Sequence, residues 1–130
     1  MEREIIDTNN APQLLKTKGI PLNQAIKVGS LVYTSGQVGF DHRANKIVEG
    51  GVRAQTRQSL ENLKNILEAA GSSLDKVAKV TVFLTDMKDF EEMNEIYREY
   101  FPRNPPARSC VAVSALAWGL VVEIEAVAIT

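Results

Sequence analysis

The sequence is short of the residues from which proteins build disulfides and most zinc sites. It has one cysteine, Cys110, and one histidine, His42. A single cysteine cannot form an internal disulfide, and a zinc site made of histidine and cysteine needs more ligands than these two. The sequence therefore predicts neither a disulfide framework nor such a metal site, and we expect a reducing compartment, by default the cytoplasm.

Long apolar runs and a strong charge of either sign are also missing. No apolar stretch reaches the ~18 residues that a transmembrane helix needs. The charged N-terminus, Met1-Glu2-Arg3-Glu4, is not followed by the apolar core of a signal peptide. The formal net charge is −1, so bulk electrostatics do not favour nucleic acid as a partner. We therefore expect neither a membrane nor a nucleic acid as partner.

What the sequence does contain is typical of one folded domain. Its 130 residues are 45% apolar and 24% charged, which is the ordinary range for a globular protein. No repeat, low-complexity segment or flexible linker divides the chain. We therefore predict a single domain over residues 1–130.

The hydrophobic pattern predicts an α+β fold with the order β-β-α-β-α-β-β. We expect helices at 52–70 and 90–101, the second capped by Asp89, and strands at 24–28, 31–34, 77–84, 108–113 and 120–129; a further short strand at 3–7 fits the same pattern. Two helices can cover only one face of such a mixed sheet. Because the other face would expose apolar side chains, the sequence also predicts an oligomer.

The last two strands carry the most promising polar cluster. Side chains alternate along a strand, so Arg108 and Cys110 share one face. If the loop at 114–119 closes a hairpin, Cys110 lies opposite Glu123 and Arg108 lies opposite Glu125, with Cβ atoms ~5 Å apart. An arginine, a thiol and two carboxylates would then meet on one patch.

Each member of this cluster allows more than one interpretation. Arg108 presents a rigid fork of donors suited to a substrate carboxylate, or it forms a cross-strand ion pair with Glu125 on a solvated face. Glu123 could orient or deprotonate a water molecule. Cys110 is either a nucleophile or, as is more common for a lone cysteine in an apolar strand, a small core residue.

Two further positions are candidates for contact with a ligand. Ser35 and Gly36 follow a strand, and a glycine there lets the backbone come close to a bound molecule. Asn94 lies four residues after Phe90, near the apolar stripe of the second helix, where it either caps another group or faces a pocket.

Several segments resemble the RidA (YjgF-type) family. The most specific is Pro106-Ala107-Arg108-Ser109-Cys110-Val111, followed by Val122-Glu123-Ile124-Glu125-Ala126. Three more segments are similar and occur in the family's order: Val32–Val38, Gln55–Leu63 and Val82–Met87.

The resemblance implies a chorismate-mutase-like α+β fold, with two helices on one face of a mixed sheet. It implies a homotrimer with sites in the clefts between subunits. The implied reaction is the hydrolysis of reactive 2-imino and 2-enamino acids, such as 2-aminoacrylate, to 2-keto acids and ammonia without a cofactor. By motif, Arg108 would hold the substrate carboxylate, Glu123 would position or activate water, and Cys110 would contribute mainly backbone groups. Ser35 and Gly36 would line the pocket, with Asn94 nearby.

The sequence departs from the family pattern at positions that bear on substrate preference. Leu22 stands where the family usually has a tyrosine, Ala112 where it has an acidic residue, and Leu116-Ala117-Trp118 lacks the usual Pro-Lys. Two other functions are therefore weighed: a non-catalytic small-metabolite binder or regulator, and an enamine deaminase of the aminomuconate type. A ribonuclease activity, proposed for some relatives, has no support in a chain with one histidine and no basic stretch.

Overall fold

Two long helices form where apolar residues recur at three- and four-residue spacing. The computed structural model describes residues 1–130, in which α2 spans Gly51–Ala69 and α3 spans Phe90–Tyr100. The stripe predicted for the first helix is buried throughout: Val52, Leu60, Leu63, Ile66, Leu67 and Ala70. Gly71 then takes φ +81°, as the prediction that glycine ends this helix requires. Neither helix, nor the short α1 at Leu14–Thr17, combines the length and apolarity needed to cross a bilayer.

The expected cap of the second helix is wrong. The Asp89 side chain caps nothing, because a 3₁₀ turn at Met87–Asp89 precedes α3. Asp86 begins that turn instead, and its carboxylate accepts a hydrogen bond from the Lys88 N–H at 3.0 Å. The chain thus starts to wind three residues earlier than the capping-box spacing indicated.

The predicted strands all form, including the short one near the N-terminus. The main sheet has the order β1-β2-β3-β9-β7-β8, and β4 also pairs with β9 beyond the end of β3. These strands are β1 Arg3–Ile6, β2 Ala25–Val28, β3 Leu31–Thr34, β4 Gln37–Val38, β7 Val77–Leu84, β8 Ala107–Ala112 and β9 Val122–Ile129. A separate small hairpin joins β5 (Phe40–Asp41) to β6 (Lys46–Ile47), and 3₁₀ turns occupy Leu74–Lys76 and Ala117–Gly119.

The expected hairpin between the last two strands does not form. β7 lies between them, because β8 pairs with β7 in parallel and β9 pairs with β7 in antiparallel. In the parallel pair Arg108 lies beside Val80, and in the antiparallel pair Phe83 lies beside Glu123. The physical reason is the connection: α3 carries the chain back along the sheet, so β8 starts beside the start of β7.

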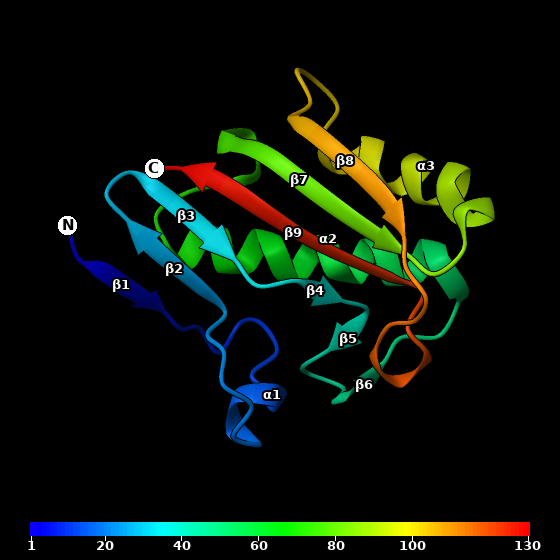
Figure 1. Cartoon of the computed structure of the whole chain (residues 1–130), viewed down its shortest axis with the longest axis horizontal. Helices are drawn as coiled ribbons and strands as arrows, with labels where there is room; N and C mark the ends of the chain where they lie inside the picture. Colours follow the sequence, from blue (N-terminus) through cyan, green and yellow to red (C-terminus); the bar gives the residue numbers. More distant parts are fainter.

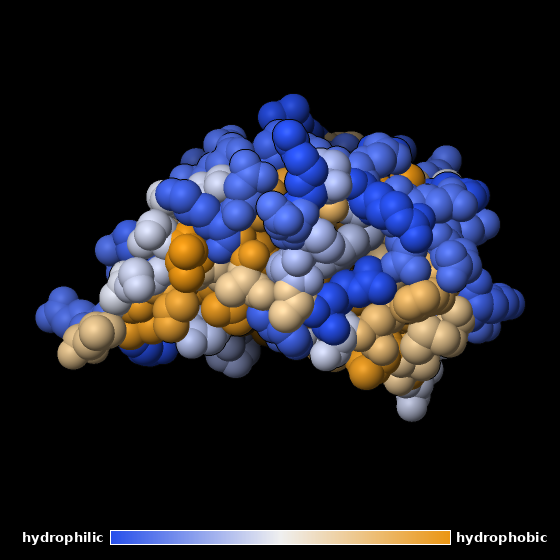
Figure 2. Space-filling view, turned by 90° about the horizontal axis from the view of Figure 1, so that it is seen from above, coloured by the Kyte–Doolittle hydropathy of each residue, from blue (hydrophilic) through white to orange (hydrophobic).

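Both long helices lie behind the sheet in the view of Figure 1, and its front face carries no helix. Figure 2 looks along the sheet from above, and hydrophobic atoms gather on the lower side, where this open face lies, while the helical side is mostly hydrophilic. Exposed apolar side chains on the open face include Tyr33, Val111 and Ile129, each more than 40% exposed. The prediction that two helices cover one face is confirmed.

Candidate active site

Glu123 lines a cavity of about 330 Å³ that is bounded by α1, β4 and the start of β9. Its side chain is half-buried, and burial raises the pKa of the Glu123 carboxyl above the ordinary value of 4.5. The negative charge of Glu125, two residues along the strand, raises that pKa further. A carboxylate with a raised pKa takes a proton from water more readily near neutral pH than an ordinary glutamate does.

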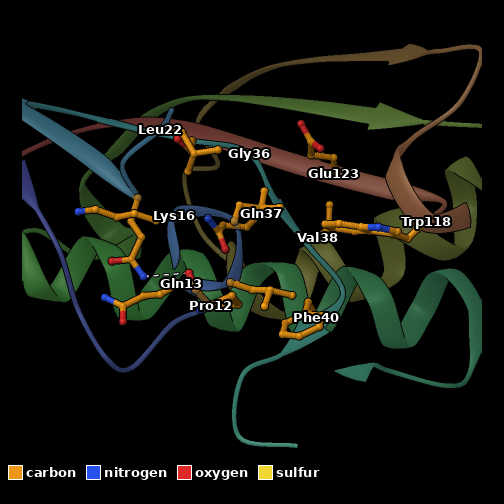
Figure 3. A pocket seen from close by; sticks show the side chains of 14 residues that line it. Pro12, Gln13, Lys16, Leu22, Gly36, Gln37, Val38, Phe40, Trp118 and Glu123 are labelled. Atoms are coloured by element: carbon orange, nitrogen blue, oxygen red, sulfur yellow. Dashed lines mark hydrogen bonds between the residues drawn. The ribbon is translucent and has the colours of Figure 1, made fainter. Parts of the chain in front are cut away.

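Ser35 and Gly36 line the same cavity, as the resemblance implied. Gly36 leaves the space that the Glu123 carboxylate occupies, since an added Cβ would lie 2.7 Å from the carboxyl carbon of Glu123. The Ser35 hydroxyl donates to the Asn23 carbonyl at 2.5 Å, which fixes the chain as it leaves β3. In Figure 3, Gly36 lies beside Glu123, and Gln37 and Val38 follow below it along the cavity.

Buried amide side chains hold the walls of this cavity. Gln24 donates to the carbonyls of Thr8 and Pro12, each at 3.0 Å, and so fastens the loop before α1. Asn62 on α2 donates to the carbonyls of Val38 and Phe40 at 3.2 and 3.0 Å. Because these amides are buried and bonded to backbone, the cavity is bounded by fixed segments.

Gln55 on α2 is another buried amide. Its Oε1 accepts a hydrogen bond at 2.9 Å from the N–H of Val121, which lies just before β9. α2 packs so closely against the segment at Gly39 that glycine is needed at this position, since an added Cβ would lie 2.7 Å from the Cα of Gln55.

Arg108 belongs to a second polar group, built on α3. Its Nη1 donates to Oδ1 of Asn94 at 2.8 Å, and its guanidinium lies 4.7 Å from the ring centroid of Tyr97 and 5.5 Å from that of Phe90. No carboxylate of the chain pairs with Arg108, so the alternative of an ion pair with Glu125 is wrong. One bond to a neutral amide leaves most of the guanidinium donors for a ligand.

Cys110 lies next to this arginine group and is half-buried against the core. Burial raises the pKa of the Cys110 thiol, and the nearby Arg108 charge only partly opposes that shift. A raised thiol pKa disfavours the thiolate, which is the nucleophilic form. The structure therefore favours a packing residue over a nucleophile at this position.

The two groups lie on opposite faces of the sheet within one chain. Arg108 pairs with Val80, which is fully buried under the helices. Glu123 instead pairs with Phe83, whose side chain lies on the open face. Cys110 pairs with Val82 across β8 and β7, and Val82 pairs in turn with the buried Ile124 of β9. Cys110 therefore lies on the same helix-covered face as Arg108. One chain thus joins Glu123 to Ser35 and Gly36, and joins Arg108 to Asn94 and Cys110, but does not bring the two groups together.

Two of the positions that depart from the family pattern line the Glu123 cavity. Leu22 lies near Gly36, and Trp118 lies on the other side of Glu123 in Figure 3. Sequence reasoning did not assign Trp118 to the site, nor did it find Gln24 or Asn62. The available signal for Asn62 was its helical spacing, since it lies four residues before the buried Ile66 and so borders the apolar stripe.

Comparison with known proteins gives the family. Residues 15–130 match the family described as Endoribonuclease L-PSP. The chain is 50% identical to a RutC family protein of Pyrococcus horikoshii over 97% of each chain. It is 45% identical to the 2-iminobutanoate/2-iminopropanoate deaminase of Mus musculus, over 98% of this chain and 91% of that protein. The crystal structure of RidA from an Antarctic Psychrobacter species superimposes with a TM-score of 0.90 at 43% identity, over 98% of this chain and 99% of that one. The chain belongs to the RidA (YjgF-type) family.

Proposed function

We propose that the chain is a hydrolase that converts 2-imino and 2-enamino acids, such as 2-aminoacrylate, to 2-keto acids and ammonia. The observation that carries this proposal is the Glu123 carboxyl, half-buried in a cavity with a pKa above its ordinary value. The identity to a mammalian 2-iminobutanoate/2-iminopropanoate deaminase supports the same reaction. No cofactor takes part in it, and a reducing compartment such as the cytoplasm suits the single free thiol.

The proposed active site is shared by two neighbouring subunits of a homotrimer. Arg108 and Glu123 occupy opposite faces of one sheet, so a substrate that touches both requires two chains. The open face of the sheet, with its exposed apolar side chains, supplies the surface for that assembly. Light scattering should therefore give about three times the chain mass of 14.3 kDa.

In the proposed reaction Arg108 binds the substrate carboxylate through two parallel hydrogen bonds, with Asn94 holding the guanidinium in place. An enamino acid first takes a proton on carbon and becomes the protonated imine. Glu123 accepts a proton from water as the water oxygen bonds to C2 of the protonated imine. Glu123 then returns the proton to the nitrogen, and the C–N bond breaks as Glu123 takes the proton of the carbinol hydroxyl. The 2-keto acid leaves, and ammonia carries that proton away as ammonium.

The direct test is ammonia release from 2-aminoacrylate that a serine dehydratase generates in the assay. Glu123→Gln should keep binding of small 2-keto acids but slow turnover by roughly 10²–10⁴-fold, the usual contribution of general acid–base catalysis. Arg108→Lys should weaken that binding by roughly 1.5–3 kcal/mol, because a point charge cannot replace the fork.

Matched controls are Glu68→Gln and Arg103→Lys, which change exposed residues outside both polar groups. Both controls should hydrolyse 2-aminoacrylate at the wild-type rate. If wild type released no ammonia beyond the uncatalysed rate yet bound keto acids, the chain would be a metabolite binder. If the two site variants matched wild type, the assigned residues would be wrong.

A further inference from the structure

Most of the exposed surface of the Glu123 cavity is apolar, although as many polar side chains as apolar ones line it, Gln13, Gln24 and Gln37 among them. Its apolar lining comes from α1, the loop before β2, β4, β5 and the 3₁₀ turn before β9: Leu14, Leu15, Leu22, Val38, Phe40 and Trp118. The charged residues of the lining are Glu123 and Lys16, and Lys16 is paired with Asp7 at 3.5 Å. A ligand group that enters this cavity beyond Glu123 therefore meets mainly hydrocarbon, and burying an apolar group there is favourable.

Trp118 is held at this cavity in an unfavourable backbone conformation. Its φ is +56° and its ψ is 28°, in the left-handed region that residues with a Cβ avoid. The residue is 56% exposed in the single chain, although an indole gains from being covered. Backbone strain of this kind persists where the surroundings need the side chain in one place, and it gathers at ligand sites.

Leu22 lies on the other side of Glu123 from Trp118 in Figure 3, where Val38 lies beside Trp118 and Phe40 lies below it. The carboxylate that would handle water thus stands between two apolar side chains. A substrate whose C2 atom is close to Glu123 would direct its side chain toward one of these walls. A methyl group would leave most of a cavity of about 330 Å³ to water, whereas a longer side chain would displace that water.

We infer that this cavity receives the substrate's side chain, and that Leu22 and Trp118 make the protein prefer 2-imino acids with long apolar or aromatic side chains. The inference rests on the proposed function, since it concerns the substrate class of the same site. A hydrophobic pocket discriminates by roughly tenfold or more for each methylene group that fills it. The leucine- and phenylalanine-derived imino acids should therefore be hydrolysed with a kcat/KM at least roughly tenfold above that of the alanine-derived one.

The experiment generates each imino acid with an amino-acid oxidase and follows how far the protein protects it from trapping by semicarbazide. Leu22→Ala and Trp118→Ala should each lower kcat/KM for the leucine- and phenylalanine-derived imines by roughly tenfold more than they lower it for the alanine-derived imine. The matched control is Met87→Ala, another exposed apolar residue that lies outside this cavity. That control should show the wild-type preference for every imine.

A binding measurement separates this inference from the proposed reaction. Trp118 is the only tryptophan, so its fluorescence reports occupancy of the cavity. The keto acid derived from leucine should change the emission and bind roughly tenfold tighter than pyruvate. Hydrolysis of no imine, together with this selective binding, would reject the proposed reaction and keep the assigned pocket.

Equal hydrolysis of all imines by wild type and both variants would overturn the inference and keep the proposed reaction. Dissociation of the oligomer by Trp118→Ala, with an unchanged preference in Leu22→Ala, would also overturn it, because the indole would then serve assembly.

Discussion

The carboxylate of Glu123 occupies the space into which a side chain at position 36 would project. A Cβ atom on Gly36 would lie 2.7 Å from the Glu123 carboxyl carbon and 2.8 Å from its Cγ. Real Cβ atoms do not approach other carbons so closely, so any side chain at position 36 displaces the carboxylate. The glycine is required by a neighbour's position and not by a positive φ, which Gly36 does not have.

Gly36→Ala should therefore reduce activity without unfolding the protein. The obstructing group is the end of a flexible side chain, which can move at modest cost, so the free energy of unfolding should change by no more than ~1 kcal/mol. Displacing the proposed base should slow imine hydrolysis by roughly 10²-fold or more. Ammonia release and urea unfolding, measured on the same preparation, check both parts.

Gly39→Ala provides the contrasting variant. Its added Cβ would lie 2.7 Å from the Cα of Gln55, which is backbone and cannot swing aside. The free energy of unfolding of that variant should fall by ~1–3 kcal/mol, the usual cost of overpacking. A Gly36→Ala protein that kept full activity would contradict the placement of Glu123 at the reacting centre.

The pH dependence of hydrolysis should report the titration of Glu123 and the effect of the neighbouring Glu125 charge on it. The proposed base acts when Glu123 is deprotonated, so kcat/KM should rise with pH through its raised pKa. Glu125→Gln removes a negative charge that helps to raise the pKa of Glu123, so the pKa should fall and the acidic limb should move to lower pH. Glu68→Gln is the charge-matched control. An acidic limb that stays in place in Glu125→Gln would reject Glu123 as the titrating group.

Cys110→Ala should leave most of the activity intact. Burial raises the thiol pKa, so the group is not prepared as a nucleophile, and its side chain packs against the core. We expect kcat/KM within about tenfold of wild type and a loss of stability on the order of 1 kcal/mol. A loss of more than about a hundredfold in a folded variant would restore the nucleophilic interpretation.

Much of the fold could be predicted because its signals are local. The spacing of Leu60, Leu63 and Leu67 defines α2, and the alternation of Val80, Val82 and Leu84 defines the buried face of β7. Strand pairing is not local, and the expected hairpin between the last two strands was wrong for that reason. The order strand, helix, strand over residues 77–112 did carry the correct signal, since a helical connection allows two strands to pair in parallel.

The site could be predicted only in part. Strand alternation and motif resemblance both led to Arg108, Cys110 and Glu123, and the strand end, the helix stripe and the same resemblance led to Ser35, Gly36 and Asn94. The structure gathers these residues into two groups. The buried amides of Gln24 and Asn62 could not be recognised, because polar residues in a loop or helix are usually exposed and only the fold supplies their partners. Trp118 could not be assigned to the site from the sequence, because only the fold places its 3₁₀ turn beside Glu123.

The central claim is that Arg108 of one subunit and Glu123 of its neighbour act on one substrate. It is tested most directly by co-expressing two impaired variants, Arg108→Lys and Glu123→Gln, so that mixed oligomers form. A shared site predicts that random mixing in a cyclic trimer restores roughly a quarter of the wild-type sites, because one neighbour then supplies an intact arginine and the other an intact glutamate. Ammonia release from 2-aminoacrylate at about that fraction of the wild-type rate would support the account, and mixed oligomers no more active than the separate variants would contradict it.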